Sequence, residues 1–139
     1  MNKILKKSKI IFVLLFFISK IVLSQNIEDL KSIFPKIREY YRHIHKNPEI
    51  GKIEYNTARF IREKLQEFGY ETISIAKLPT TVIAILNKEK TGKTICFRAE
   101  LDALKIKEET GLSFASVNTE LMHACGHDAH MAIQLLVAK

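Results

Sequence analysis

The segment from Met122 to His130 carries the side chains best suited to chemistry, because it combines one cysteine with three histidines and an aspartate. Thiolates and imidazoles are both good ligands for zinc-like divalent ions. Cys125 and His127 are two residues apart, so they point the same way only where the chain is extended, and Gly126 between them permits a tight backbone. The spacing favours a metal site with these two ligands; the alternative is a loop that carries several histidines and a free thiol.

Two carboxylates, Glu100 and Asp102, follow an apolar run that we expect to form a strand. Ligand sites in open α/β sheets gather beyond the carboxyl ends of strands, and residues two apart on an extended segment face the same side. Such carboxylates can bind a metal or hold a ligating histidine in the correct tautomer. Taken alone, however, these residues favour a solvated acidic loop paired with Arg98.

A histidine pair, His43 and His45, lies near the end of the first expected helix. Histidines at a helix C-terminus are more often structural, because the helix dipole stabilises a charged imidazole there. We therefore expect no direct metal role for either residue.

Helical periodicity dominates both ends of the region that follows residue 25. Apolar residues recur every three or four positions over 27–44, and Asn47-Pro48 ends this helix, because the residue before a proline avoids the α region. A second helix is expected over 54–68, with Gly69 as its left-handed C-terminal cap. The last helix is expected to begin near Asp128, which can serve as its N-cap.

Between the second and the last helix, apolar runs rich in β-branched residues predict three strands, over 70–75, 81–86 and 94–99. This order of elements predicts an α/β domain in which helices flank a central mixed sheet. Cys96 lies inside the third run, so we expect it to be a buried core thiol.

Four separated motifs resemble those of the N-acyl-amino-acid amidohydrolases, the metallopeptidase branch that holds hippurate hydrolases, aminoacylases and the plant indole-acetyl-amino-acid hydrolases. The motifs are Arg42-x-x-His45-x-x-Pro48-Glu49 with Glu54-x-x-Thr57, Arg98-Ala-Glu-Leu-Asp102-Ala-Leu104, Glu109-Thr-Gly-Leu112 with Phe114-Ala-Ser116, and Met122-His-Ala-Cys-Gly-His-Asp128. The resemblance covers nearly everything from Arg38 to Lys139, and it matches only the N-terminal part of a family member.

The resemblance implies a zinc-peptidase-like catalytic domain that holds two divalent ions (Mn, Zn, Ni or Co) and hydrolyses N-acyl amino acids or short peptides. Cys125 and His127 match two metal ligands, and Asp102 matches the carboxylate that supports the site. The family's remaining ligands, its glutamate general base and its lid domain would lie beyond Lys139. Residues 25–139 are therefore expected to be a truncated catalytic domain that is inactive alone. A homodimer is left open for the complete enzyme.

Three positions depart from the family pattern. Glu100 replaces the usual aspartate, Lys105 replaces a proline, and Thr81 replaces a glycine. Glu100 keeps the charge but extends the side chain by a methylene. These changes concern the fine geometry of substrate binding and leave the resemblance to the family intact.

The positive charge of the chain is concentrated at its N-terminus. The formal charge is +7, but five of the 22 basic residues and no acidic residue lie in the first 24 positions, so the remainder is nearly balanced. The chain contains no basic patch interleaved with aromatic residues, which is the pattern typical of nucleic-acid binding, so we expect no nucleic-acid partner.

The N-terminus is typical of a secretory signal peptide over 1–24. It has a basic start, nine apolar residues over 10–18 and a cleavage position after Ser24. An uncleaved membrane anchor is the alternative.

A second function class stays open from the sequence alone. A catalytic zinc site uses about three protein ligands plus water, and only Cys125 and His127 are identified here. The alternative to an amidohydrolase is therefore an exported, non-catalytic metal-binding or interaction fragment.

Overall fold

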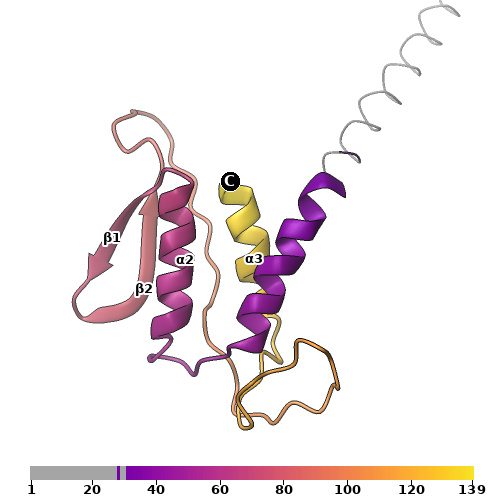
Figure 1. Ribbon diagram of the computed structural model, residues 1–139. Coiled ribbons are helices and arrows are strands. Elements are labelled where there is room, and N and C mark those ends of the chain that lie inside the picture. The colour runs from indigo at the N-terminus through magenta and orange to yellow at the C-terminus, as the bar shows by residue number, and fades with distance from the viewer. Residues whose placement is uncertain (1–27, 29–30) are drawn as a thin grey trace, which may run out of the picture. The chain divides into compact units, whose positions relative to one another are not determined.

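The computed structural model describes residue 28 and residues 31–139. The chain divides into two units, Met1–Pro35 and Lys36–Lys139, and every contact discussed below lies within the second unit (Figure 1). The predicted signal segment 1–24 and its cleavage position lie outside the described residues. In the described part of the chain, no helix combines the length and the hydropathy needed to span a bilayer.

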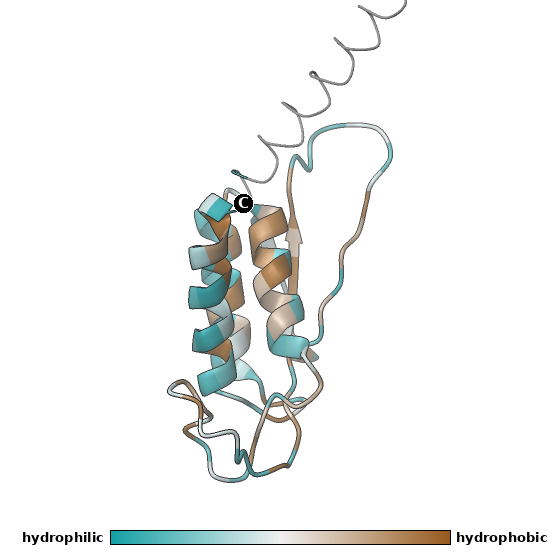
Figure 2. Ribbon diagram, turned by 90° about the vertical axis from the view of Figure 1, so that its right-hand side faces the viewer, coloured by the Kyte–Doolittle hydropathy of each residue, from teal (hydrophilic) through white to brown (hydrophobic). Residues whose placement is uncertain are grey.

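Three helices of the second unit enclose its hydrophobic core: the helix over 36–46, α2 (Tyr55–Glu67) and α3 (His127–Ala138). Each contributes apolar side chains spaced three or four positions apart, as the sequence predicts for helices with one buried face. The buried cluster consists of Tyr40, Ile44, Ile61, Met131, Ala132 and Leu135. In Figure 2 the apolar residues of α3, which ends near the label C, appear in brown. The core therefore holds α3 in place through its buried residues, and the predicted metal ligands lie at the start of this helix.

The ends of α2 follow from local hydrogen bonding. The carboxylate of Glu49 accepts hydrogen bonds from the backbone nitrogens of Asn56, at 3.1 Å, and Thr57, at 2.7 Å, and so caps the helix from the preceding loop. At the other end, Gly69 has a φ of +87°, and the nitrogens of Gly69 and Tyr70 donate to carbonyls of the last turn. This is a Schellman motif, and it confirms the predicted glycine cap.

The sheet consists of β1 (Glu71–Ile75) and β2 (Leu78–Ile85), paired antiparallel with an irregularity between Ile73 and Ile75. Two isolated bridges lie elsewhere, a parallel one from Ile50 to Ala103 and an antiparallel one from Leu104 to Met122. Helix α2 packs on both strands and on α3. The predicted α/β class is confirmed, with both kinds of pairing present but only two strands in the described sheet.

The strand predicted over 94–99 does not form, and the predicted burial of Cys96 is wrong. Cys96 is exposed, and its neighbours Ile95 and Phe97 are 78% and 66% exposed. A strand needs a hydrogen-bonded neighbour and an apolar face needs a cover, and no described residue supplies either for this run. The segment is still attached near its end, because the side chain of Gln134 in α3 donates to the carbonyl of Arg98.

Helix α3 begins one residue before the predicted start, and Asp128 is not its N-cap. The N-cap is Gly126, whose φ of +84° is left-handed and sets the sharp turn between Cys125 and the helix. Asp128 lies in the first turn and is only 1% exposed. Because Gly126 is the N-cap, the Asp128 side chain does not cap the helix, and its carboxylate is buried in the protein.

Replacing Gly126 by alanine is expected to destabilise the fold by about 1–2 kcal/mol, the cost of a left-handed conformation for a residue with a Cβ. The added Cβ would meet no heavy atom within 4 Å, so the cost comes from the backbone alone. Gly51 is the matched control, because its φ lies outside the left-handed region and its Cβ would make ordinary contacts. Urea unfolding should show a lower midpoint for Gly126→Ala only; equal midpoints for the two variants would contradict this account.

Candidate metal centre

Short backbone pairings bring three distant segments together at the site. The nitrogen of Ala103 donates to the carbonyl of Glu49 at 2.8 Å, and Leu104 and Met122 exchange two hydrogen bonds of 3.0 Å. These bonds fix the segment that holds Asp102 beside the segment that leads into Cys125. The sequence motifs therefore meet through main-chain contacts that do not depend on the side chains proposed to do chemistry.

His127 is oriented by Asp102. Its Nδ1 atom lies 3.0 Å from the Asp102 carbonyl oxygen and 3.1 Å from Asp102 Oδ1. Both partners are hydrogen-bond acceptors, so Nδ1 must carry the proton, and Nε2 keeps the lone pair that a metal ligand needs. The structure thus brings Asp102 next to His127, as the resemblance implied for a supporting carboxylate, although the two residues differ by 25 positions and neither lies in the β1–β2 sheet.

Cys125 is a free, exposed thiol immediately before the Gly126 turn. Together with His127 it offers one sulfur and one nitrogen donor, the combination that suits zinc-like ions. The residues present thus fit part of a divalent metal site. Within the described residues there is no group of three or more His, Cys, Asp or Glu side chains that could hold a metal, so further ligands would have to come from solvent or additional protein.

Glu100 does not join the site. Its carboxylate forms an ion pair with Arg98 at 2.8 Å, and the Arg98 side chain is 81% exposed. This pair matches the solvated interpretation that the residues alone favoured for Glu100.

A buried charge cluster adjoins the site and was missed by the sequence analysis. His45, only 3% exposed, places Nδ1 2.6 Å from Asp128 Oδ2 and Nε2 3.2 Å from Glu108 Oε1. Because both partners are carboxylates, both ring nitrogens donate and the ring is an imidazolium. Burial lowers the pKa of His45, but the hydrogen bonds to Asp128 and Glu108 outweigh it and raise the pKa above its ordinary value. The signal available in the sequence was the position of His45 in the first family motif.

Glu108 holds together the loop over 108–117, which follows the segment that contains Asp102. Its carboxylate accepts hydrogen bonds from the Thr110 hydroxyl, from the Ser116 backbone nitrogen at 2.6 Å and from His45. Burial raises the pKa of Glu108, yet these hydrogen bonds prevail and hold the pKa below its ordinary value. The nitrogen of Val117 then donates to the carbonyl of Lys46 at 2.9 Å. The loop over 108–117 is therefore tied to the end of the first helix.

His123 and His43 have different surroundings. His123 is 4% exposed, and neither of its ring nitrogens has a partner among the described residues. Burial lowers its pKa, so the ring is neutral.

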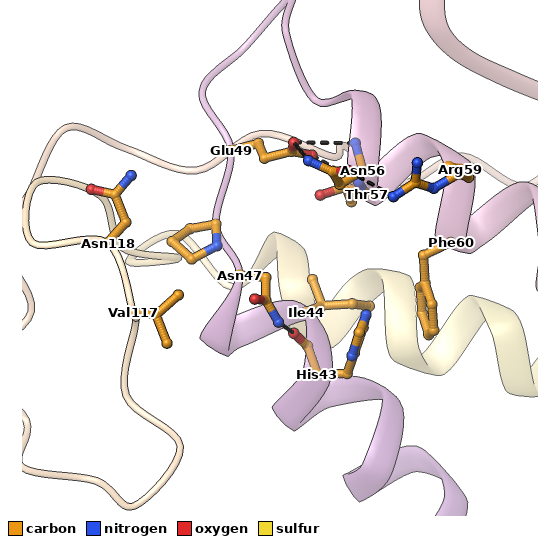
Figure 3. A pocket seen from close by; sticks show the side chains of 11 residues that line it. His43, Ile44, Asn47, Glu49, Asn56, Thr57, Arg59, Phe60, Val117 and Asn118 are labelled. Carbon is orange, nitrogen blue, oxygen red and sulfur yellow. Dashed lines mark hydrogen bonds between the residues drawn. The ribbon is translucent and has the colours of Figure 1, made fainter.

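His43 is exposed and stacks on Phe60, with ring centroids 4.3 Å apart, beside a pocket of about 420 Å³ (Figure 3). Asn47 and Glu49 also line that pocket, and both already form hydrogen bonds with backbone groups.

The charge cluster predicts the pH dependence of stability. The raised pKa of His45 gives a stabilisation that is complete below the unfolded value of 6.5 and is lost as pH rises through the folded pKa. The lowered pKa of Glu108 gives a stabilisation that is present above 4.5 and is lost as pH falls through the folded pKa. We therefore expect the unfolding free energy to be greatest between these two values.

Urea unfolding at a series of pH values measures this dependence. Stability should fall as pH rises above 6.5, and a His45→Leu variant should lose that slope because it lacks the titrating ring. His43→Leu is the control, since this exposed ring contacts neither carboxylate of the cluster, and the variant should keep the slope. A stability that rises through neutral pH in the unsubstituted chain would contradict the assignment of His45 as an imidazolium.

Comparisons with known proteins agree with this geometry. Residues 96–139 match the sequence model of Peptidase family M20/M25/M40. The chain is 46% identical to a hippurate hydrolase of Campylobacter jejuni, covering 80% of this chain and 28% of that protein. It is 44% identical to an N-acetyldiaminopimelate deacetylase of Oenococcus oeni, covering 68% of this chain and 25% of that one. The chain thus spans about a quarter of the length of these curated relatives.

A solved structure gives the same result for the fold. A dinuclear metal-binding peptidase of the M20 family from Bacillus subtilis superposes with a TM-score of 0.70 and 37% identity. The superposition covers 78% of this chain and 32% of that one. Residues 96–139, which match the family model, include Asp102, Cys125 and His127.

Proposed function

Since the chain belongs to peptidase family M20/M25/M40, we propose that it forms the N-terminal part of a metal-dependent amidohydrolase that cleaves the amide bond of N-acyl amino acids. The observation that carries the proposal is the hydrogen bonding of His127 Nδ1 to Asp102, beside the free thiol of Cys125. This arrangement leaves one imidazole lone pair and one sulfur for a cation, and Asp102 fixes the orientation of the imidazole.

The relatives suggest the class of substrate. A hippurate hydrolase and an N-acetyldiaminopimelate deacetylase both act on an acyl group attached to an amine nitrogen. The bound divalent ions of such an enzyme act as Lewis acids and lower the pKa of a bound water. Within this chain, His127 and Cys125 would hold a cation, and Asp102 would keep the His127 ring in the ligating tautomer. We propose two ions in the complete site, in line with the dinuclear relative.

A segment exchange tests the proposed function. Residues 36–139 would replace the matching segment of the Campylobacter jejuni hippurate hydrolase, to which the chain is 46% identical. The hybrid should release glycine from hippurate, and a chelator should stop the release. Cys125→Ala in the hybrid should abolish the activity, whereas Cys96→Ala, at the other free and exposed cysteine, should leave it unchanged.

Two results would count against the proposal. A folded hybrid that releases no glycine would show that this segment cannot complete an amidohydrolase site, as a non-catalytic fragment would behave. Metal-dependent release of glycine by the isolated 139-residue chain would contradict the expectation that further residues complete the site.

We also propose that residues 1–24 direct export and are removed after Ser24. The support is the basic start followed by nine apolar residues, a length below the roughly 20 residues of a spanning helix. Mass spectrometry of the exported protein should find a chain that begins at Gln25. A cytoplasmic protein that retains Met1 would contradict the proposal.

A further inference from the structure

His45 bonds both to the first turn of α3, which carries His127, and to the loop over 108–117. Through Nδ1 it holds Asp128, the residue that follows His127 in the first turn of α3. Through Nε2 it holds Glu108, which organises the loop over 108–117. The two bonds span 83 and 63 positions of the sequence, so one imidazole ring links three segments.

Asp128 is placed where it could interfere with the site. Its carboxylate is one residue from His127 and three from Cys125, and carboxylates are themselves metal ligands. In the structure both oxygens are occupied, Oδ2 by His45 at 2.6 Å and Oδ1 by the backbone nitrogen of Ala129 at 2.9 Å. The side chain is buried within the protein, on a helix whose start is defined by the Gly126 turn.

We propose that His45 is a positioning residue for the metal centre: its Nδ1 bond to Asp128 fixes the first turn of α3 and withholds that carboxylate from the cation held by Cys125 and His127. The Nε2 bond to Glu108 serves the loop instead, because Glu108 forms its hydrogen bonds with His45, Thr110 and Ser116. The inference rests on the proposed function. It assigns the order of the metal centre to Nδ1 of His45 and the order of the loop over 108–117 to Nε2.

Two amide substitutions at His45 test the roles of Nδ1 and Nε2 separately. In His45→Asn the amide nitrogen is the same number of bonds from Cα as Nδ1, so it can still donate to Asp128. In His45→Gln the amide nitrogen is the same number of bonds from Cα as Nε2, so it can still reach toward Glu108. Both variants remove the ring and its charge, and they differ from each other by one methylene. His43→Asn, at an exposed position on the same helix, is the control.

The metal readout is Co²⁺ titration of the chain, followed by the thiolate-to-cobalt charge-transfer absorbance that reports a Cys125–Co²⁺ bond. His45→Gln should weaken Co²⁺ binding by about 10- to 100-fold, the usual cost of losing a group that orients a ligand. His45→Asn and His43→Asn should bind Co²⁺ like the unsubstituted chain. The loop readout is amide hydrogen exchange at Ser116 and Val117, which should accelerate in His45→Asn and stay slow in His45→Gln.

The outcomes separate the inference from the proposed function. Equal Co²⁺ affinities for the Asn and Gln variants, whether both weak or both unchanged, would overturn the positioning role of the Nδ1 bond. Two variants that both fail to fold would give equal affinities and would also overturn it, since the role would then be structural. A missing thiolate band in the unsubstituted chain would instead overturn the metal centre itself, and the inference with it.

Discussion

Replacing Cys125 by alanine is expected to lower the affinity of the chain for Zn²⁺ or Co²⁺ by at least about 100-fold, beyond the roughly 10- to 100-fold that an outer-shell contact is worth. His127→Ala should have a comparable effect. The reason is that Cys125 and His127 are the two expected donors, placed on either side of the Gly126 turn, so each removal leaves a single protein ligand. An ion with one protein ligand is held mainly by water and gains little from the protein.

Calorimetric titration of each variant measures this effect. Cys96→Ala is the matched control, because Cys96 is also a free and exposed thiol but lies outside the site. It should bind metal like the unsubstituted chain. If Cys125→Ala bound the ion as tightly as Cys96→Ala, the sulfur of Cys125 would not be a ligand and the site would have to be placed elsewhere.

The second large effect concerns stability. Asp128→Ala is expected to lower the unfolding free energy by about 3–5 kcal/mol, because it leaves the His45 imidazolium buried with one of its two carboxylates removed. The side chains of Asp128 and His45 are only 2% and 4% exposed, so water cannot solvate the imidazolium that the substitution leaves with one carboxylate. A loss of this size is a large part of the stability of a domain.

An exposed ion pair provides the control for this variant. Glu109, whose side chain is 76% exposed, pairs with Lys107, and Glu109→Ala should cost no more than about 1 kcal/mol. Urea unfolding of the two variants at pH 6, where His45 is charged, makes the comparison. A cost for Asp128→Ala as small as that for Glu109→Ala would show that the buried cluster does not hold the fold together.

Local patterns predicted the elements whose stabilising contacts lie close in the sequence. The helical spacing before Pro48, the cap at Gly69 and the runs that became β1 and β2 are all recovered in the structure. The convergence of Asp102 with His127 was also predicted, but from the resemblance to a family, since nothing in the 24 intervening positions specifies it.

Predictions failed where the structure depends on a partner distant in sequence. Residues 94–99 have the composition of a strand, but composition does not supply the neighbouring strand, and without it Cys96 is exposed. The start of α3 was misplaced because Asp128 has two competing uses, capping a helix or pairing with a cation, and His45 lies 83 positions away. A lone histidine at a helix end does not reveal that it will be buried between two carboxylates.

The coordination of a bound ion tests the central claim most directly. X-ray absorption spectroscopy of the Zn²⁺-loaded chain should show one sulfur neighbour at about 2.3 Å and one imidazole nitrogen at about 2.0 Å, with oxygen atoms completing the shell. Cys125→Ala should remove the sulfur contribution, and Cys96→Ala should leave it in place. A zinc shell of nitrogen and oxygen atoms without sulfur in the unsubstituted chain would contradict the account.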